Sequence, residues 1–378
     1  MINMKIQFFL FFLAVTILAT PVANILFARS ENPGIKHVTV YYEAGMGGYW
    51  PASYPVFARG DEILIGFSRV YYKDLGPARH AIDRDKPGYT RFARSLDGGE
   101  TWSIEIPKDG VFDHSVALRH CNEGMHFHHP DFLLAASTNS VHAGQSRFWY
   151  SYDRGHRWTG PCRLPNFGTL GTAARTDYLI NGNRDMMLFL TVAKSSGREG
   201  RTMVAHTADG GIEWNFRSWI GPEPEGFSIM PSSVRLSESE LLVTVRRREG
   251  PKRFISAYLS DNNGTSWSHI NDPADTGIGS PPAMIQLKDG RIALAYGYRS
   301  DHGSSLKITF SSDSGRTWGN AIELRGDDGA DRDIGYPRMV QRTDGKLVIL
   351  YYWNHALQEN AAPYRYIAST IVDPDKLE

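Results

Sequence analysis

The sequence is poor in cysteine and carries no excess of charge of either sign. Among its 378 residues only Cys121 and Cys162 are cysteines, which excludes a disulfide-dense scaffold and a Cys-x-x-Cys metal site. Its 41 Lys and Arg residues balance 41 Asp and Glu residues, so net charge does not favour a nucleic acid partner. The two cysteines either pair in an oxidising compartment or remain buried thiols.

Long apolar runs are missing beyond the N-terminus. Lys5 precedes an apolar run over residues 8–19, and small residues with Pro21 follow this run. This order predicts a secretory signal peptide over residues 1–23 and a linker over 24–36, with an uncleaved membrane anchor as the alternative. We therefore expect a secreted or periplasmic protein that has no stable membrane association after cleavage.

One motif that contains both glycine and tryptophan recurs along the sequence. The pattern Ser/Thr-x-Asp/Asn-x-Gly-x-x-Trp occurs in the octets 95–102, 151–158, 207–214, 260–267 and 311–318. In each octet the Asp or Asn side chain can accept backbone N–H bonds of a tight turn, while Gly takes a positive φ. The Trp is expected to fold back and pack between neighbouring units. Five such octets indicate a repeat architecture.

Pairs of apolar strands interleave with the octets. Six such pairs begin near residues 54, 129, 175, 230, 280 and 336. Together with the octets they give four short antiparallel strands per unit, which is typical of a β-propeller blade. We predict an all-β fold, a six-bladed β-propeller over residues 37–378, whose last blade is completed by the N-terminal strand near His37. Closure by both chain ends would remove the exposed sheet edges.

Polar residues are predicted to gather at one rim of this propeller. The octet turns all lie between the third and fourth strands of their units, so the strand entries and the other long loops face the opposite rim. The candidate substrate-binding residues there are Arg79, His129, Asp131, Arg175, Asp177, Arg247, Arg299, Asp333 and Arg338. Converging arginines suit a carboxylate ligand, because each guanidinium can donate two parallel hydrogen bonds.

A histidine cluster at this predicted rim has a second interpretation. His126, His128 and His129 could bind a metal ion, but no companion ligand set is apparent in the sequence. We therefore expect neither a metal nor another cofactor.

The octets resemble Asp-boxes, also called BNR repeats, and six units with such boxes resemble the sialidase superfamily over residues 37–373. The resemblance extends to a broad group of secreted bacterial BNR-repeat proteins. It implies a glycosidase with a Tyr nucleophile at the entry to the last blade, a Glu partner as its base and an Asp acid/base. By blade order Tyr336 matches the nucleophile, Asp83 the acid/base and Glu249 the partner.

The resemblance also implies three arginines that hold the substrate carboxylate. Arg247 and Arg299 lie in the zones of two of them, and Arg175 and Arg338 can supply a grip from other blades. Sialidases begin blade one with Arg-Ile/Leu-Pro, whereas residues 53–55 read Ser-Tyr-Pro.

Three functions are compatible with these residues. The first is an exported, monomeric exo-acting glycoside hydrolase that releases an acidic sugar, with sialic acid as the leading candidate, from a glycan or oligosaccharide. The second is a polysaccharide lyase that acts at a uronic acid, with His80 or His129 as the base. The third is a non-catalytic propeller that binds a glycan or a protein.

Overall fold

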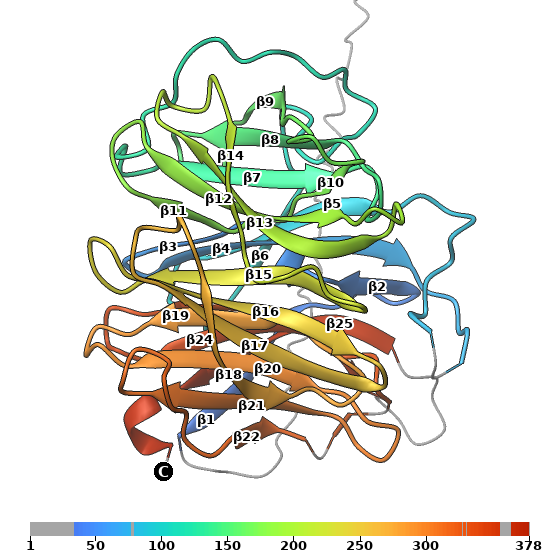
Figure 1. The fold of residues 1–378 in the computed structure, drawn as a ribbon. Helices are drawn as coiled ribbons and strands as arrows, with labels where there is room; N and C mark the ends of the chain where they lie inside the picture. Colours follow the sequence, from blue (N-terminus) through green and yellow to red (C-terminus); the bar gives the residue numbers. More distant parts are fainter. Residues whose placement is uncertain (1–33, 77–78, 327, 330, 356–363, 378) are drawn as a thin grey trace, which may run out of the picture. The chain divides into compact units, whose positions relative to one another are not determined.

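The computed structural model describes residues 34–76, 79–326, 328–329, 331–355 and 364–377. The predicted signal peptide and most of the predicted linker lie outside the described residues. The described part forms one compact unit of six antiparallel sheets (Figure 1). This confirms the predicted all-β six-bladed propeller. Among the described residues, none forms a helix with the length and apolarity that crossing a bilayer requires.

The strands follow one another blade by blade. Blade one contains β2 (Met46–Tyr49), β3 (Val56–Arg59), β4 (Glu62–Tyr71), β5 (Tyr89–Ser95) and β6 (Ser103–Glu105). Blade two contains β7 (Leu133–Thr138), β8 (Ser146–Ser151) and β9 (Thr159–Arg163). Blade three contains β10 (Thr172–Ala173), β11 (Tyr178–Ile180), β12 (Met186–Ala193), β13 (Glu199–Thr207) and β14 (Asn215–Trp219).

The remaining blades have four strands each. Blade four contains β15 (Phe227–Arg235), β16 (Leu241–Glu249), β17 (Lys252–Ser260) and β18 (Ser268–Asp275). Blade five contains β19 (Pro282–Gln286), β20 (Ile292–Tyr298), β21 (Ser305–Ser311) and β22 (Ile322–Arg325). Blade six contains β23 (Gly335–Gln341), β24 (Leu347–His355), β25 (Tyr364–Val372) and β1 (Ile35–Tyr41). Two short 3-10 helices are η1 (Pro51–Ser53) and η2 (Pro374–Lys376).

The N-terminal strand completes blade six, as predicted. β1 pairs antiparallel with β25, so that Ile35 lies opposite Val372. The sheet order is β1-β25-β24-β23, which places β1 on the outside of the blade. Hydrogen bonds between the first and last strands therefore close the ring.

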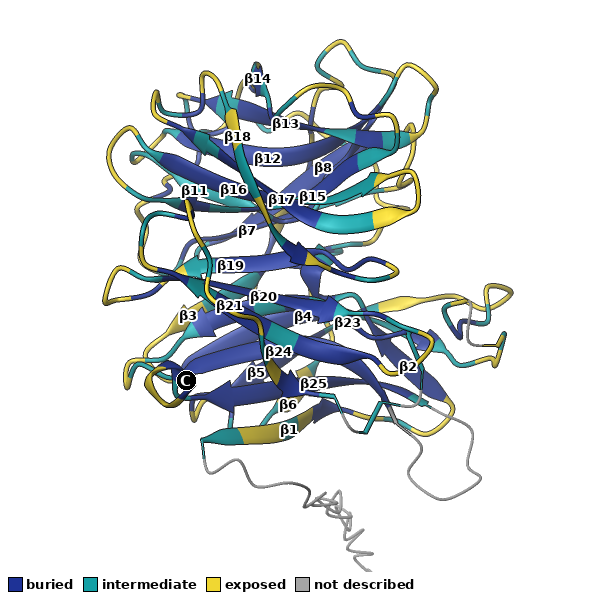
Figure 2. Ribbon diagram, turned by 60° about the horizontal axis from the view of Figure 1, so that its bottom comes forward, coloured by how far each residue is buried: buried dark blue, intermediate teal, exposed yellow. Residues whose placement is uncertain are grey.

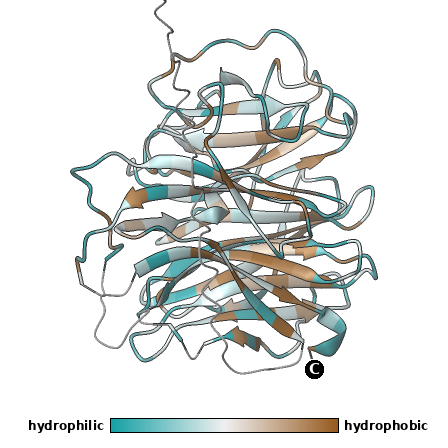
Figure 3. Ribbon diagram, turned by 180° about the vertical axis from the view of Figure 1, so that it is seen from behind, coloured by the Kyte–Doolittle hydropathy of each residue, from teal (hydrophilic) through white to brown (hydrophobic). Residues whose placement is uncertain are grey.

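The apolar core lies between neighbouring blades. One cluster joins Leu64 and Phe92 of blade one to Leu133 and Trp149 of blade two, and Trp158 completes it. The strands are largely buried and the loops largely exposed (Figure 2). Figure 3 shows the matching pattern, with hydrophobic residues along the strands. Each blade thus buries its apolar faces against its neighbours.

The octets form one recurring turn that joins adjacent blades. Ser151 Oγ donates to Asp153 at 2.8 Å and accepts from the Gly155 N–H at 2.9 Å. Trp158 Nε1 donates to the Gly155 carbonyl at 3.0 Å, and Gly155 has φ 84°. The preceding Arg154 also has a positive φ, of 60°. The predicted turn geometry, glycine conformation and Trp packing are confirmed.

Blade two has three strands among the described residues, and blade three covers its inner edge. The Ala136 N–H donates to Thr176 Oγ1 at 3.0 Å, and the Leu134 N–H donates to the Tyr178 hydroxyl at 3.5 Å. Side chains from the next blade thus satisfy part of the free edge of β7. Cys121 and Cys162 form a disulfide with their Cα atoms 5.5 Å apart. Of the two alternatives for the cysteines, the structure has the paired one.

A pair of glycine substitutions tests the contact between octets and blades. An alanine Cβ at Gly155 would lie 2.6 Å from Leu64 Cδ2 of the preceding blade, whereas Gly250, with φ 52°, has open space around it. Both substitutions place a Cβ on left-handed backbone, but only the first also creates a clash. We expect Gly155→Ala to lower the free energy of unfolding by about 2–4 kcal/mol and Gly250→Ala by about 1 kcal/mol. Denaturant titration measures both, and equal losses would contradict the packing role of the octet.

Candidate functional site

The same unusual backbone recurs along the innermost strands of three blades. Trp50, Met230 and Tyr336 each precede a proline and have φ values of 56°, 54° and 53°. Non-glycine residues seldom adopt this conformation, and such strain concentrates at functional sites. The strand registers shift at this point in blades four and six. Met230 and Tyr336 belong to one apolar cluster with Ala52, so blades one, four and six meet there.

This equivalence changes the counterpart of Tyr336 in blade one. The matching dipeptide is Trp50-Pro51, by its conformation, and not Tyr54-Pro55 as the sequence pattern suggested. The residue before Trp50 is Tyr49, which is fully buried. Blade one therefore contributes aromatic residues to the centre in place of an arginine.

Three arginines from three other blades surround Tyr336. Arg246 Nη1 donates to the Tyr336 hydroxyl at 3.1 Å, and the Arg299 guanidinium lies 5.2 Å from the centroid of the Tyr336 ring. Burial raises the pKa of Tyr336, but the positive charges of Arg246, Arg299 and Arg175 outweigh it and hold the pKa below that of an ordinary tyrosine. The structure thus brings together three sequence-predicted residues, Tyr336, Arg175 and Arg299.

Arg175 is itself paired. Its Nη1 lies 2.6 Å from Glu199 Oε1, and both side chains are largely buried. Neither Glu199 nor Arg246 was among the sequence-predicted site residues. Glu199 opens β13, at the end of the strand that faces away from the octet turn, and this position is its only signal in the sequence.

Arg247, which was predicted from the sequence, lies on the other face of β16. It donates to the Tyr258 hydroxyl at 2.6 Å and pairs with Glu249. Successive side chains of a strand alternate between its faces, so only one of Arg246 and Arg247 can reach Tyr336. Glu249 is about half exposed and has its described partner in Arg247, not in Tyr336.

A second polar cluster is centred on Asp333, which is 4% exposed. Its carboxylate lies 2.7 Å from His80 Nδ1 and accepts from the Tyr352 hydroxyl at 2.7 Å and from Arg365 Nε at 3.0 Å. Burial raises the pKa of Asp333, but the hydrogen bond to His80 and the charges of His80, Arg365 and Arg299 hold it well below the usual range. Asp333 is therefore a fixed negative charge.

Tyr352 connects the two clusters. Its ring lies 5.9 Å from the Tyr336 ring and 6.5 Å from the His80 ring, measured between centroids. Arg299 donates to the hydroxyl of Tyr352 and, at 2.7 Å, to the carbonyl of Ile334. His80 and Asp333, both predicted from the sequence, therefore lie beside the Tyr336 cluster.

Asp83 and Arg79 share a loop with His80 but have other surroundings. The Asp83 carboxylate lies 3.6 Å from Lys73 Nζ and 3.6 Å from Lys86 Nζ. Arg79 is exposed. The described contacts of Asp83 stay within its own blade, and its role as acid/base stays a prediction.

His129 and Asp131 lie at the octet rim. The Asp131 carbonyl accepts from the Arg154 N–H of the octet 151–158, and its carboxylate pairs with Arg59. The exposed His129 ring packs 5.0 Å from Tyr152 of the same octet. This corrects their predicted position at the opposite rim, because residues 129–131 precede β7, the strand that leads away from the octet rim.

Arg338, in β23, and Asp177, just before β11, lie near enough for their charges to interact. Arg338 donates to the carbonyls of Ala52 and Thr176, next to the segments that carry Trp50 and Arg175. One Asp177 oxygen accepts weakly from the Ser233 N–H at 3.4 Å, and the other has no hydrogen-bond partner among the described residues. Burial raises the pKa of Asp177 to about 7 despite the charge of Arg338.

The raised pKa of Asp177 predicts a pH-dependent stability. Below about pH 3 the Asp177 carboxyl is protonated in both the folded and unfolded states. As the pH rises from there to about 7, the unfolded chain releases this proton and the folded chain keeps it, so the free energy of unfolding falls. We expect Asp177→Asn to remove about 1–3 kcal/mol of this fall. Denaturant titration at pH 5 and pH 8 measures it; an unchanged pH dependence in Asp177→Asn would contradict this.

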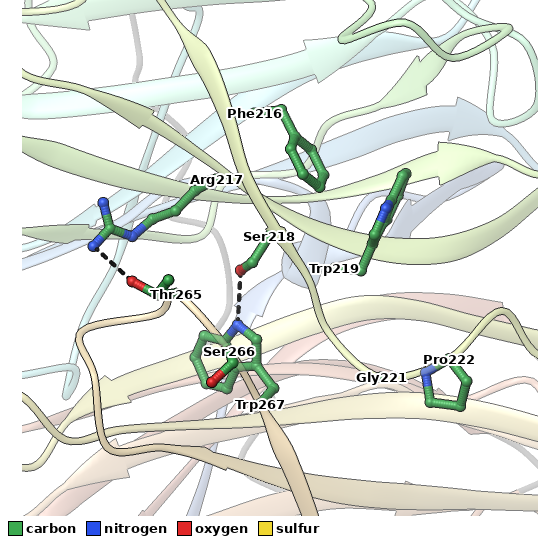
Figure 4. A pocket seen from close by; sticks show the side chains of 9 residues that line it. All are labelled: Phe216, Arg217, Ser218, Trp219, Gly221, Pro222, Thr265, Ser266 and Trp267. Atoms are coloured by element: carbon green, nitrogen blue, oxygen red, sulfur yellow. Dashed lines mark hydrogen bonds between the residues drawn. The ribbon is translucent and has the colours of Figure 1, made fainter.

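The larger of two described surface cavities lies elsewhere. It has a volume of about 450 Å³ and lies between β14 and the octet 260–267 (Figure 4). Its lining residues are Phe216, Arg217, Ser218, Trp219, Gly221, Pro222, Thr265, Ser266 and Trp267. Because β14 is the outermost strand of blade three, this groove is separate from the Tyr336 cluster. Among the described residues, no group of three His, Cys, Asp or Glu side chains is placed to hold a metal ion.

The chain matches one protein family model, described as a BNR repeat-like domain, over residues 132–349. This match covers more than half of the chain. A comparison with curated proteins gave no match. The Asp-box resemblance seen in the sequence is therefore confirmed by the family model.

Solved structures with the same fold cover most of the chain. A Dyadobacter fermentans protein of unknown function is 17% identical, with a TM-score of 0.70 over 90% of this chain and 99% of that one. The α-L-arabinofuranosidase of Fusarium graminearum with arabinobiose is 13% identical, with a TM-score of 0.55 over 88% and 98%. Trypanosoma rangeli sialidase with sialic acid is 13% identical, with a TM-score of 0.54 over 92% and 60%. At these identities the likeness shows the fold.

Proposed function

The chain belongs to the family of BNR repeat-like domains, and we propose that it is an exo-acting glycoside hydrolase that releases an acidic sugar from a glycan. The observation that carries this proposal is the Tyr336 hydroxyl with three guanidiniums around it. These guanidiniums come from separate blades: Arg246 donates to the hydroxyl, Arg299 lies over the ring, and the charge of Arg175 lowers the pKa of the phenol. Such an arrangement is what a carboxylate-bearing sugar requires.

The charges in this cluster favour an anionic ligand. Glu199 offsets only Arg175. The Nε–H of Arg246 is buried and has no hydrogen-bond partner among the described residues. A bound carboxylate would supply the missing acceptor and would offset the remaining positive charge. Sialic acid, a sugar with a carboxylate at its anomeric carbon, is the leading candidate.

Tyr336 is suited to act as the nucleophile. A neutral phenol approaches an anionic sugar without repulsion, and the three arginines favour its phenolate when the proton leaves. A covalent intermediate on Tyr336 implies that the sugar leaves with its anomeric configuration retained. Glu199 orients Arg175 through their ion pair, and we assign it the partner role that the sequence suggested for Glu249.

The proposed place of action is outside the cytoplasm. The N-terminal signal predicted over residues 1–23 directs export, and the Cys121–Cys162 disulfide is compatible with an oxidising compartment. We propose that the protein acts as a monomer.

Tyr336→Phe tests the proposed chemistry. We expect the wild type to release the fluorophore from an α-sialoside or, failing that, from a uronide, and the variant to lose about 10³-fold or more in kcat/KM, because the phenyl ring has no nucleophilic oxygen. Tyr89→Phe, at an exposed position of β5, is the matched control and should retain its rate. A folded Tyr336→Phe protein with full activity would overturn the assignment.

Arginine substitutions test which face of β16 meets the substrate. We expect Arg246→Lys to lower kcat/KM by about 10–100-fold, because an ammonium cannot replace a two-donor grip on a carboxylate. Arg247→Lys should have a much smaller effect, since Arg247 contacts Tyr258 instead. A larger loss in Arg247→Lys than in Arg246→Lys would contradict the arrangement around Tyr336.

A lyase acting at a uronic acid is the second candidate function, and the His80–Asp333 pair favours it. A histidine beside arginines can remove the proton next to a neutralised carboxylate. The lyase product is unsaturated and absorbs ultraviolet light, whereas hydrolysis gives no such product. Absorbance recorded on acidic polysaccharides therefore separates the two functions.

A further inference from the structure

We propose that His80, oriented by Asp333, is the residue that gives a proton to the leaving group and later takes one from water in this site. The inference rests on the proposed function, since it names the acid/base partner of Tyr336. It replaces Asp83, whose carboxylate lies between Lys73 and Lys86.

His80 is held in one orientation at the Tyr336 cluster. Its ring meets the Trp50 ring edge-on at 5.3 Å and the Tyr49 ring at 5.8 Å, measured between centroids. Its Nδ1 lies 2.7 Å from the Asp333 carboxylate. The ionised Asp333 accepts a hydrogen bond from Nδ1–H, which leaves Nε2 as the nitrogen that exchanges a proton.

The side chain is accessible at the same time. The His80 side chain is 28% exposed, and its Nε2 has no hydrogen-bond partner among the described residues. A buried carboxylate behind an accessible imidazole is the arrangement by which an orienting acid serves a general acid/base.

Other charged and titratable groups fix the state of this pair. Tyr49 from β2 and Tyr352 from β24 donate to Asp333, at 3.4 Å and 2.7 Å. Arg365 from β25 donates to it at 3.0 Å, and Arg299 from blade five bonds Tyr352. These partners keep Asp333 charged, so Asp333 remains the hydrogen-bond acceptor for His80 Nδ1–H.

The proposed reaction has two steps, and the sugar is bonded to Tyr336 between them. Once the sugar is bound, the neutral Tyr336 hydroxyl passes its proton to neutral His80, which gives the Tyr336 phenolate and protonated His80. Protonated His80 then gives its Nε2 proton to the glycosidic oxygen while the phenolate bonds to the anomeric carbon. The glycosidic bond breaks, and the aglycone leaves as an alcohol. Neutral His80 then takes a proton from water, whose oxygen bonds to the anomeric carbon. The bond to Tyr336 breaks, and the phenolate and the protonated imidazole are restored with the free sugar.

Leaving groups of different acidity test this role. His80→Gln is compared with wild type on an alkyl glycoside, which needs protonation to leave, and on a dinitrophenyl glycoside of the same sugar, which does not. We expect His80→Gln to lose about 10²–10⁴-fold in kcat/KM on the alkyl glycoside and less than about 10-fold on the dinitrophenyl glycoside. Tyr336→Phe should lose activity on both.

Two further variants serve as comparisons. Asp333→Asn should lose activity in the same leaving-group-dependent pattern, and its melting temperature reports whether the buried cluster stays folded. His302→Gln, at an exposed position in the loop after β20, should match wild type on both substrates. Equal losses on both glycosides in His80→Gln, or no loss on either, would overturn the proposal.

The product formed by the wild type distinguishes a failure of the proposed function from a failure of the role of His80. If the wild type forms an unsaturated product instead, the hydrolase proposal fails, and retention of that activity in His80→Gln overturns the inference too. Nitrogen chemical shifts of the imidazole give a readout without substrate. The Nδ1–H tautomer of neutral His80, lost in Asp333→Asn, supports the placement, and the Nε2–H tautomer in the wild type overturns it.

Discussion

The structure depends on the burial of apolar strand faces between neighbouring sheets. A single blade has too few residues to cover both of its faces, so each blade needs the next one, and the series is complete only when the ring closes. The octet turns strengthen this contact at one rim, where Trp158 and Gly155 meet Leu64 of the preceding blade. At the opposite rim the octet turns do not hold the blades together, so the loops and strand entries there can carry charged groups.

The site forms where the innermost strands converge. Trp50, Met230 and Tyr336 share a strained left-handed backbone conformation, and the closed ring around them supports it. The arginines around Tyr336 would repel one another in isolation. Glu199 and the fixed charge of Asp333 offset part of that repulsion, so the centre stays positive without being unstable.

The fold was predictable because its signals are local. An octet specifies its own turn, so five octets identify the blades, and an unmatched strand at each chain end indicates the closure. The site was less predictable, because it depends on the parity of a strand and on contacts between distant blades. Arg246 and Arg247 are adjacent arginines that the sequence alone does not distinguish. Only the register of β16 decides that Arg246 is the one that faces Tyr336. The position of His129 was missed because blade two has three strands among the described residues. Residues 129–131 therefore lead directly into β7, which begins at the octet rim.

The pairing of β1 with β25 has a consequence for how the molecule is made. The strand that leaves the ribosome early finds its partner only after more than three hundred further residues have been synthesised. Until then β1 has an unpaired edge, and blade six is incomplete. The ring can therefore close only after β25 has been synthesised, because β25 is the strand that pairs with both β1 and β24.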